Sequence, residues 1–172
     1  MIGHVILSHG LESGPDATKV TALAAAAEAL GWTSERPDYL ACDRAAGFGR
    51  LGDVAGRVAQ LCARARAVDG PLVLAGSSLG AYICALASLA RPCAGLFLLA
   101  PPPLLEDHPP LRAAAVPTCI VHGWRDELIP AQHVIDWAQP RRDRLLLVDD
   151  DHRLSAHVGY CADRFVDFLR SL

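Results

Sequence analysis

A serine bracketed by two glycines, Gly76-x-Ser78-x-Gly80, is the part of this sequence that most directly suggests chemistry. It follows the apolar run 72–76 and precedes an Ala- and Leu-rich run long enough for several helical turns. In a sharp turn from strand to helix, such glycines remove side chains that would collide with neighbouring backbone, and the serine lies at the helix N-terminus. Unpaired N–H groups there favour the negative charge that develops during acyl transfer. Ser78 is therefore the predicted nucleophile; adjacent Ser77 is the rival, and a solvated serine in a structural turn is the non-functional alternative.

A serine hydroxyl is a weak nucleophile at neutral pH, and it needs a base whose charge is in turn stabilised by an anion. His152 comes directly after the apolar run 144–149, and Asp126 comes shortly after the run 117–122. His157 lies further from the end of its run and is the rival base. The sequence therefore predicts that Ser78, His152 and Asp126 meet as nucleophile, base and acid.

Short apolar runs alternate with segments of helical periodicity along the chain. This alternation predicts a mostly parallel sheet covered by helices on both faces, an α/β fold of three α/β/α layers in a single domain, residues 1–172. Ligands bind such open sheets at the carboxyl ends of the strands, where Ser78, Asp126 and His152 all fall. The predicted strands are residues 4–8, 33–40, 72–76, 94–100, 117–122 and 144–149.

The first two helices are predicted from apolar spacing and from residues that favour helix ends. Asp16 is the expected N-cap of the first helix, and Gly31 lies just past its end. In the second helix, Arg50, Arg57 and Arg64 recur at a regular spacing and are expected on a solvated face.

The C-terminal part of the chain holds a loop and two further helices. The proline-rich segment 101–116 shows no helical pattern and is predicted to be a loop. A short helix is predicted over residues 130–138, with Pro130 in its first turn. The last helix is expected to bury Val158, Cys161, Phe165, Phe168 and Leu172.

Composition excludes several classes of protein. The net charge of −3 and the 52% content of hydrophobic residues exclude a disordered chain and give no attraction to nucleic acid or anionic membranes. The chain starts without a signal-peptide pattern, and no apolar run approaches the roughly 18 residues of a membrane span. A cytoplasmic protein with free thiols is expected, because the cysteines form no CxxC pair and lie mostly in apolar segments: Cys42, Cys62, Cys84, Cys93, Cys119 and Cys161.

The order Ser78, Asp126, His152, together with the segments around these residues, resembles α/β-hydrolases over nearly the whole chain. The shared motifs are a His-Gly turn after the first strand, the Gly-x-Ser-x-Gly turn, a His-Gly-x-x-Asp-x-x-x-Pro loop and a late histidine. The loop's spacing to Pro130 favours Asp126 over Glu127 as the acid. Within the superfamily the chain is similar to compact bacterial serine hydrolases and carboxylesterases, which lack a lid domain, with the usual eight strands reduced to about six.

This resemblance implies a serine esterase that hydrolyses a small carboxylic ester or thioester through an acyl-enzyme intermediate. It implies an oxyanion hole made by the backbone N–H groups of Leu11 and Leu79, and no cofactor or metal is expected. A monomer or a homodimer is expected, the latter through pairing of an exposed sheet edge with a second copy. The short segment 101–116 implies an open, shallow pocket rather than an enclosed one for a long lipid. Residues expected near that pocket are Leu11, Glu12, Ser13, Tyr82, Leu104, Leu105 and Trp124.

Other interpretations stay open at this point. The run Asp149-Asp150-Asp151, with Asp107 and His108, could hold a divalent cation through oxygen ligands, although consecutive residues at a strand end rarely converge. We therefore expect those carboxylates to be solvated. The fold itself does not choose between esterase, amidase, lactonase and carbon–carbon hydrolase, nor does it exclude a binding or scaffold protein.

Overall fold

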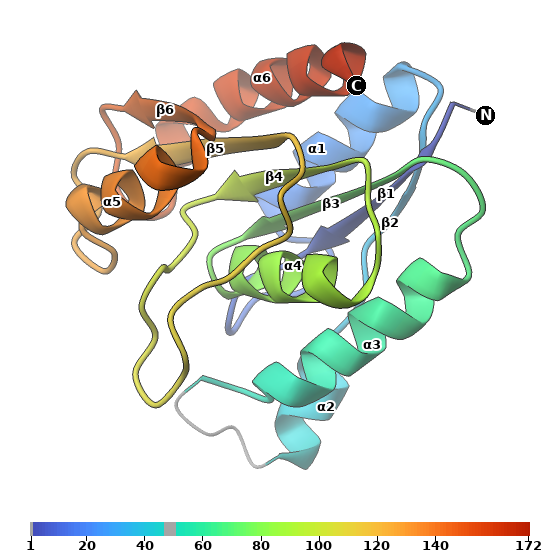
Figure 1. Ribbon diagram of the computed structural model, residues 1–172, viewed down its shortest axis with the longest axis horizontal. Coiled ribbons are helices and arrows are strands. Elements are labelled where there is room, and N and C mark those ends of the chain that lie inside the picture. Colours follow the sequence, from blue (N-terminus) through green and yellow to red (C-terminus); the bar gives the residue numbers. More distant parts are fainter. Residues whose placement is uncertain (1, 47–50) are drawn as a thin grey trace.

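The structure is a computed structural model that describes residues 2–46 and 51–172, and its centre is a six-stranded, all-parallel sheet (Figure 1). The strands lie in the order β2-β1-β3-β4-β5-β6. The three-layer architecture and the strand number predicted from sequence are confirmed. The strands are β1 (His4–Ser8), β2 (Thr33–Glu35), β3 (Leu72–Ser77), β4 (Gly95–Leu99), β5 (Thr118–Gly123) and β6 (Arg144–Val148).

The chain first moves outward from β1 to β2 and then crosses back to β3, so the strand order switches between β1 and β3. The second strand lies on one side of β1, whereas β3 and all later strands lie on the other side. Ser8, the last residue of β1, is in register with Gly76 near the end of β3. Ligands of open parallel sheets bind where the strand order reverses, at the carboxyl ends of the strands. The segments that follow β1 and β3 are therefore placed to build a site together.

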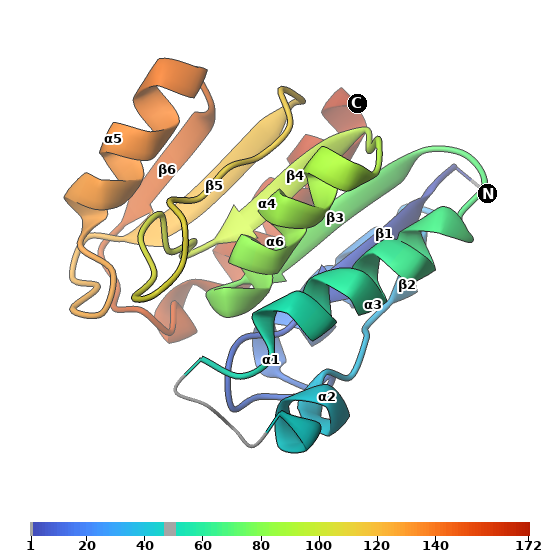
Figure 2. The same cartoon turned by 60° about the horizontal axis from the view of Figure 1, so that its bottom comes forward.

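Helices cover both faces of the sheet. Figure 2 shows α3, α4 and α5 in front of the sheet and α1 and α6 behind it. For α1 and for α3 to α5 the two-sided arrangement follows from right-handed crossovers, because the chain moves one way from β1 to β2 and the opposite way from β2 to β3 and the later strands. The helices are α1 (Thr18–Ala29), α2 (Leu40–Ala45), α3 (Val54–Arg66), α4 (Leu79–Ala90), α5 (Ala131–Arg141) and α6 (Val158–Ser171), the last preceded by a 3₁₀ turn (Ser155–His157).

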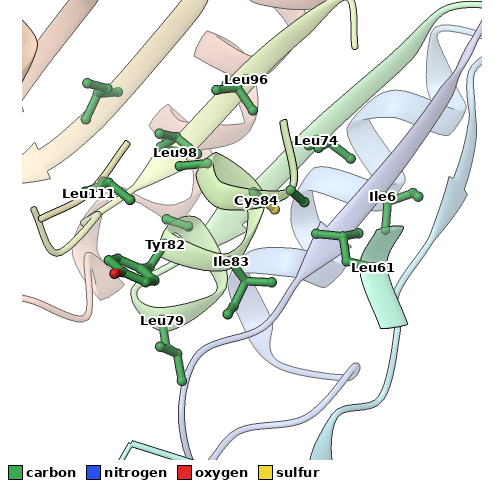
Figure 3. Packing of buried hydrophobic residues seen from close by; sticks show 14 of the residues in the cluster. Ile6, Leu61, Leu74, Leu79, Tyr82, Ile83, Cys84, Leu96, Leu98 and Leu111 are labelled. Carbon is green, nitrogen blue, oxygen red and sulfur yellow. The ribbon is translucent and has the colours of Figure 1, made fainter. Parts of the chain in front are cut away.

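Side chains of each central strand alternate between two apolar cores. In β3, Leu72 and Leu74 lie in the core shared with α3, α4 and α5, whereas Val73 and Ala75 lie in the core shared with α1 and α6. Figure 3 shows the first of these cores, where Leu61 of α3 and Ile83 of α4 lie near the sheet. A strand buried on both faces reads as a continuous apolar run, which is why these strands were predictable.

The segment 101–116, all of it described, contains no helix or strand, as predicted, yet it covers the sheet as a helix would. Leu111 is buried in the same core as Tyr82 (Figure 3). The Tyr82 hydroxyl donates to the carbonyl of Pro109 (2.7 Å), and the Trp137 indole N–H donates to the carbonyl of Leu111 (2.8 Å). The expectation that Tyr82 lines a substrate pocket is therefore wrong, because the side chain is only 1% exposed and supports this loop.

The predicted strand over residues 33–40 is wrong beyond Glu35. Pro37 has no N–H to donate to a ladder, and the chain leaves the sheet edge there. Tyr39 then turns into the interior, where its hydroxyl lies 2.9 Å from the Ser8 hydroxyl. The helix α2 starts at the next residue and was not predicted.

The arginine row predicted on a solvated face of α3 is also wrong. The Arg57 side chain is fully buried and pairs with Asp43. Arg64 is partly exposed and pairs with Glu35. Arg50 lies outside the described residues, so the prediction for it stays untested.

Helix ends were predicted with mixed success. Ala17, not Asp16, is the N-cap of α1, and no side chain caps that helix; the Asp16 carboxylate instead lies 3.6 Å from Arg36. Gly31 follows the end of α1 with a φ of 82°, as its position predicted. Pro130 is the N-cap of α5 rather than a first-turn residue, and the helix runs beyond the predicted end. In α6 the expected apolar face is buried at Cys161, Phe165 and Phe168, half-buried at Val158 and exposed at Leu172.

Replacing Gly80 by alanine is expected to destabilise the fold by about 3 kcal/mol or more, because the added methyl group meets backbone that cannot move aside. That Cβ would overlap the carbonyl oxygen of Ser8 and lie 2.7 Å from that of His9. Gly159→Ala in α6 is the matched control, because nothing lies within 4 Å of its Cβ and alanine favours a helix by about 0.5–1 kcal/mol. Urea unfolding checks both variants; equal midpoints for Gly80→Ala and wild type would contradict this account of the turn.

Candidate active site

The turn between β3 and α4 presents Ser78 at the carboxyl edge of the sheet. Ser78 is the N-cap of α4 and has a φ of 54° and a ψ of −121°, a strained backbone conformation for a residue with a side chain. The turn is so tight that a Cβ on Gly76 would lie only 2.5 Å from the backbone of Gly80. The glycines at both positions are therefore required by the geometry, as the motif predicted. The Ser78 side chain is only partly buried and can be reached from solvent.

Ser78, His152 and Asp126 come together in a chain of hydrogen bonds. The Ser78 Oγ lies 2.9 Å from His152 Nε2, and His152 Nδ1 lies 2.7 Å from Asp126 Oδ2. An ionised carboxylate only accepts hydrogen bonds, so His152 donates from Nδ1 and keeps a lone pair on Nε2 that faces the serine hydroxyl. Such an arrangement can remove a proton from the serine and stabilise the imidazolium that results.

Asp126 is fixed by the loop that follows β5. Its Oδ1 accepts hydrogen bonds from the backbone N–H groups of Leu128 (3.0 Å) and Ile129 (2.8 Å). Burial alone would raise the pKa of Asp126, but the hydrogen bonds from His152 and from the Ile129 N–H outweigh it and hold that pKa below the ordinary value. The carboxylate that faces His152 is therefore ionised at neutral pH.

His122 holds the loop after β5 in place from the interior of the protein. It is fully buried, and its Nε2–H donates to the carbonyl of Ile129 (2.9 Å). Burial lowers the pKa of His122, so the ring stays neutral although Nε2 lies 3.6 Å from Asp126. A neutral ring leaves the negative charge of Asp126 available to His152.

The loop that carries His152 is held by Asp150 and Lys19. Asp150 is buried and accepts hydrogen bonds from His157 Nδ1 (2.9 Å) and from the Ala156 N–H (3.0 Å). Lys19 of α1 donates to the carbonyl of Arg153 (2.6 Å), next to His152. His157, the rival base, thus pairs with a different carboxylate. Of the three consecutive aspartates expected to be solvated, Asp150 is not, which corrects that expectation.

Acid is expected to weaken the fold through Asp150. Burial raises the pKa of Asp150, but the hydrogen bonds from His157 and from two backbone N–H groups outweigh it and lower the pKa. A carboxyl whose pKa is lower in the folded chain adds stability that is complete above its unfolded pKa of about 3.9 and is lost as the pH falls through the folded value. We expect Asp150→Asn to reduce the slope of unfolding free energy against pH below about pH 5.

Urea unfolding between neutral pH and pH 3 measures this slope. The matched control is Asp149→Asn, since Asp149 is exposed and pairs with the exposed Arg125. Identical slopes for Asp150→Asn and wild type would show that Asp150 does not carry the effect.

The turn after β1 lies directly against Ser78. A Cβ on Gly10 would lie 3.6 Å from the Ser78 Cβ, so the backbone passes close to the predicted nucleophile. The His9 ring holds this turn in shape: Nδ1 donates to the carbonyl of Gly10 (2.8 Å), and Nε2 accepts from the Tyr39 N–H (3.1 Å). Burial lowers the pKa of His9, which keeps the ring neutral and fixes this pattern.

The other residues expected near the pocket divide into supports and exposed groups. Ser13 donates to the carbonyl of Gly10 (3.2 Å) and thus supports the turn. Glu12 is exposed, with a φ of 55°. Leu11 and Leu105 are partly buried against the core of α3, α4 and α5. Exposed apolar side chains follow the carboxyl ends of β4 and β5, and they are Leu104, Trp124 and Leu128, the last of which was not predicted.

A separate hollow of about 510 Å³ lies at the opposite edge of the sheet and includes none of the residues of the candidate site. It is lined mainly by apolar side chains, among them Ile2, Trp32 and Pro71, which lie just before the first residues of β1, β2 and β3. Catalytic groups of parallel sheets gather at the other edge. The hollow is therefore not part of the candidate active site, which is defined by the hydrogen-bonded side chains of Ser78, His152 and Asp126.

Two of the three consecutive aspartates considered for a divalent cation have other partners. Within residues 2–46 and 51–172, no group of three or more His, Cys, Asp or Glu side chains is placed to hold a metal ion. Asp149 pairs with Arg125, and Asp150 pairs with His157. His108 packs edge-on against Tyr82, 6.3 Å between ring centres.

Sequence reasoning missed the buried group around Arg57, Asp43 and Tyr39. Arg57 was assigned to a polar face because it is charged. Its position between Val54 and Leu61, at helical spacing on the buried face of α3, was the available signal for burial. Asp43 and Tyr39 belong to a segment whose structure was predicted incorrectly, so nothing in the pattern pointed to them.

Comparisons with known proteins agree with this fold. Residues 2–160 match the family described as alpha/beta hydrolase domain. A crystal structure of a protein assigned to the alpha/beta hydrolase superfamily, from Xanthomonas campestris pv. campestris, is 59% identical, with a TM-score of 0.96 and 99% of each chain covered. No match was found among curated proteins.

More distant structures are similar over almost the whole chain. An alpha-beta serine hydrolase homologue from Coxiella burnetii is 25% identical, with a TM-score of 0.80 and coverage of 98% of this chain and 86% of that one. A second Xanthomonas campestris protein, a serine hydrolase without a lid, is 23% identical, with a TM-score of 0.77 and coverage of 99% and 83%, and it supports the fold alone. In the described part of the chain, no helix is both long and apolar enough to span a bilayer.

Proposed function

This chain belongs to the α/β hydrolase family, and we propose that it is a serine hydrolase that cleaves small carboxylic esters or thioesters. One observation carries the proposal: the unbroken hydrogen-bonded chain from Ser78 through His152 to Asp126, at a strained turn that exposes the serine. The similarity to a serine hydrolase homologue from Coxiella burnetii supports it.

In the proposed reaction, the Ser78 Oγ attacks the carbonyl carbon of the substrate while His152 Nε2 takes the serine proton. His152 then gives this proton to the leaving alcohol or thiol as the carbon–oxygen or carbon–sulfur bond breaks, and an acyl-serine remains. Water attacks the acyl-serine with His152 again acting as the base, and the acid is released. Asp126 holds His152 in the required tautomer and stabilises its charged form. No step requires a cofactor.

The developing oxyanion is proposed to accept hydrogen bonds from the backbone N–H groups of Leu11 and Leu79. Leu79 is the first residue of α4, and the first N–H groups of a helix have no partner within it. Leu11 follows the Gly10 turn, which lies against Ser78. The positive end of the α4 dipole adds to the stabilisation of negative charge at this point.

The substrate class is argued from what surrounds Ser78. Segment 101–116 is held by hydrogen bonds from Tyr82 of α4 and Trp137 of α5, and we propose that in this position it leaves the serine open to solvent. Trp124 and Leu128 follow β5 and are more than half exposed, which suits an apolar group that lies on an open surface. We therefore propose short acyl groups as preferred substrates. Leu104 and Glu12 are the remaining candidates for contacts with the substrate.

The experiment is a rate series on p-nitrophenyl esters of increasing acyl length, with an acetyl thioester and the matching acetyl anilide in parallel. We expect kcat/KM to be highest for acyl chains of about two to four carbons, to fall at least about tenfold for long chains, and to be unaffected by a chelator. A preference for long chains would contradict the open pocket. Hydrolysis of the anilide alone would make the protein an amidase, and no hydrolysis of any of these substrates would refute the proposed function.

We also propose that the protein works in the cytoplasm. All six cysteines are free. Burial raises the pKa of Cys84 to about 12 and that of Cys119 to about 11, so these thiols stay protonated and unreactive. Treatment of the folded protein with oxidised glutathione should leave its activity unchanged.

A further inference from the structure

A fully buried ion pair lies behind the turn that precedes Leu11. Arg57 of α3 contacts Asp43 of α2 through two hydrogen bonds, Nε to Oδ1 (3.0 Å) and Nη2 to Oδ2 (2.5 Å), and both side chains are wholly inaccessible to solvent. A buried pair of this kind seldom stabilises a fold more than apolar residues of the same volume would. Its presence therefore calls for a reason other than stability.

The remaining guanidinium nitrogen points to the turn. Arg57 Nη1 donates to the carbonyl of His9 (3.2 Å) and, at longer range, to that of Gly10 (3.5 Å). The Gly10 carbonyl also accepts from His9 Nδ1 (2.8 Å) and from the Ser13 hydroxyl (3.2 Å). Three side chains thus converge on one peptide group next to Ser78.

This peptide group is the one that carries the Leu11 N–H. In a planar trans peptide the C=O of one residue and the N–H of the next point in opposite directions. Donors that fix the Gly10 carbonyl therefore also fix the direction of the Leu11 N–H. A buried cation on the carbonyl side further polarises the peptide and makes its N–H a stronger donor to an anion.

Arg57 is itself held in place from several sides. Asp43 Oδ1 also accepts from the Asp53 N–H (2.9 Å), which joins the pair to the start of α3. The guanidinium lies over the Tyr39 ring, 5.0 Å from its centre, and the Tyr39 hydroxyl lies 2.9 Å from that of Ser8. The position of Nη1 is thus tied to the end of β1, from which the turn begins.

We infer that Arg57, held by Asp43, is a positioning residue that aims and strengthens the Leu11 N–H as an oxyanion donor. The inference rests on the proposed function and extends it to a buried pair that touches neither substrate nor Ser78. Because the oxyanion exists only in the transition state and in the tetrahedral intermediate, the pair should act on kcat and not on KM.

The test is a neutral pair, Asp43→Asn with Arg57→Met, which leaves no buried charge unpaired and keeps an oxygen acceptor for the Asp53 N–H. We expect kcat for p-nitrophenyl acetate to fall about 10²-fold with KM changed less than about twofold. Affinity for a trifluoromethyl ketone, which forms a tetrahedral adduct with a serine, should fall by the same factor as kcat/KM. Arg57→Lys should retain part of the activity, because Nζ can still donate to the turn.

The matched control is Arg64→Met, which removes an arginine of the same helix that pairs with Glu35 at the surface and should leave kcat unchanged. A lower Tm with unchanged kcat per folded molecule, or a raised KM with unchanged kcat, would overturn the inference and make the pair structural. If the neutral pair does not fold, Arg57→Lys replaces it in the same test: its loss of affinity for the trifluoromethyl ketone should equal its loss of kcat/KM. Absence of hydrolysis by the wild type would instead refute the proposed function.

Discussion

Replacing Ser78 by alanine is expected to lower kcat for an activated ester by about 10⁶-fold, because no other group in the site can form the acyl-enzyme. The fold should be unaffected. Alanine keeps a Cβ at the same backbone angles, and the hydrogen bond that it loses is the one to His152. Initial rates with p-nitrophenyl acetate measure the first effect, and the Tm measures the second.

Ser77→Ala is the control for this prediction, since Ser77 is the adjacent serine and lies within β3. It should retain activity within a few-fold of wild type. Full activity of Ser78→Ala with loss of activity in Ser77→Ala would show that Ser77 is the nucleophile. The hydrogen bond between Ser78 and His152 would then have no catalytic role, which would refute the proposal.

Replacing Asp126 by asparagine is expected to lower kcat by about 10⁴-fold, with little change in KM. The backbone N–H groups of Leu128 and Ile129 require an acceptor at the Oδ1 position, so the new amide group must place its NH₂ toward His152. His152 would then accept at Nδ1 and carry its proton on Nε2, where it can no longer take the proton of Ser78.

Glu127→Gln is the matched control, because Glu127 is the neighbouring acid and is exposed. Its kcat should equal that of wild type. A loss of activity in Glu127→Gln comparable to that in Asp126→Asn would show that Asp126 is not the acid that pairs with His152.

The sequence was informative where a structural position accepts only a few residue types. Strands buried on both faces, such as β3 and β4, must be continuous apolar runs, and their predicted ends were within one residue of those observed. The turn at Ser78 needs glycine at two fixed positions, so the motif itself defines the geometry. The convergence predicted for Ser78, Asp126 and His152 followed from their places at strand ends.

Other features depend on tertiary contacts that periodicity does not encode. Beyond the end of the edge strand β2, Tyr39 turns inward and contacts Ser8 and Arg57, which apolar spacing does not indicate. Arg57 is buried because Asp43, distant in sequence, supplies a carboxylate. A charged residue is normally assigned to solvent, and only the fold reveals its partner. Tyr82 was misassigned for a related reason, since its partner is a loop carbonyl at Pro109.

Reaction with a fluorophosphonate, followed by peptide mapping by mass spectrometry, tests the convergence of Ser78, His152 and Asp126 most directly. We expect one adduct per chain on the peptide that contains Ser78, none in Ser78→Ala, and much slower formation in Asp126→Asn. An adduct on another residue, or no adduct on a protein that hydrolyses esters, would contradict the account.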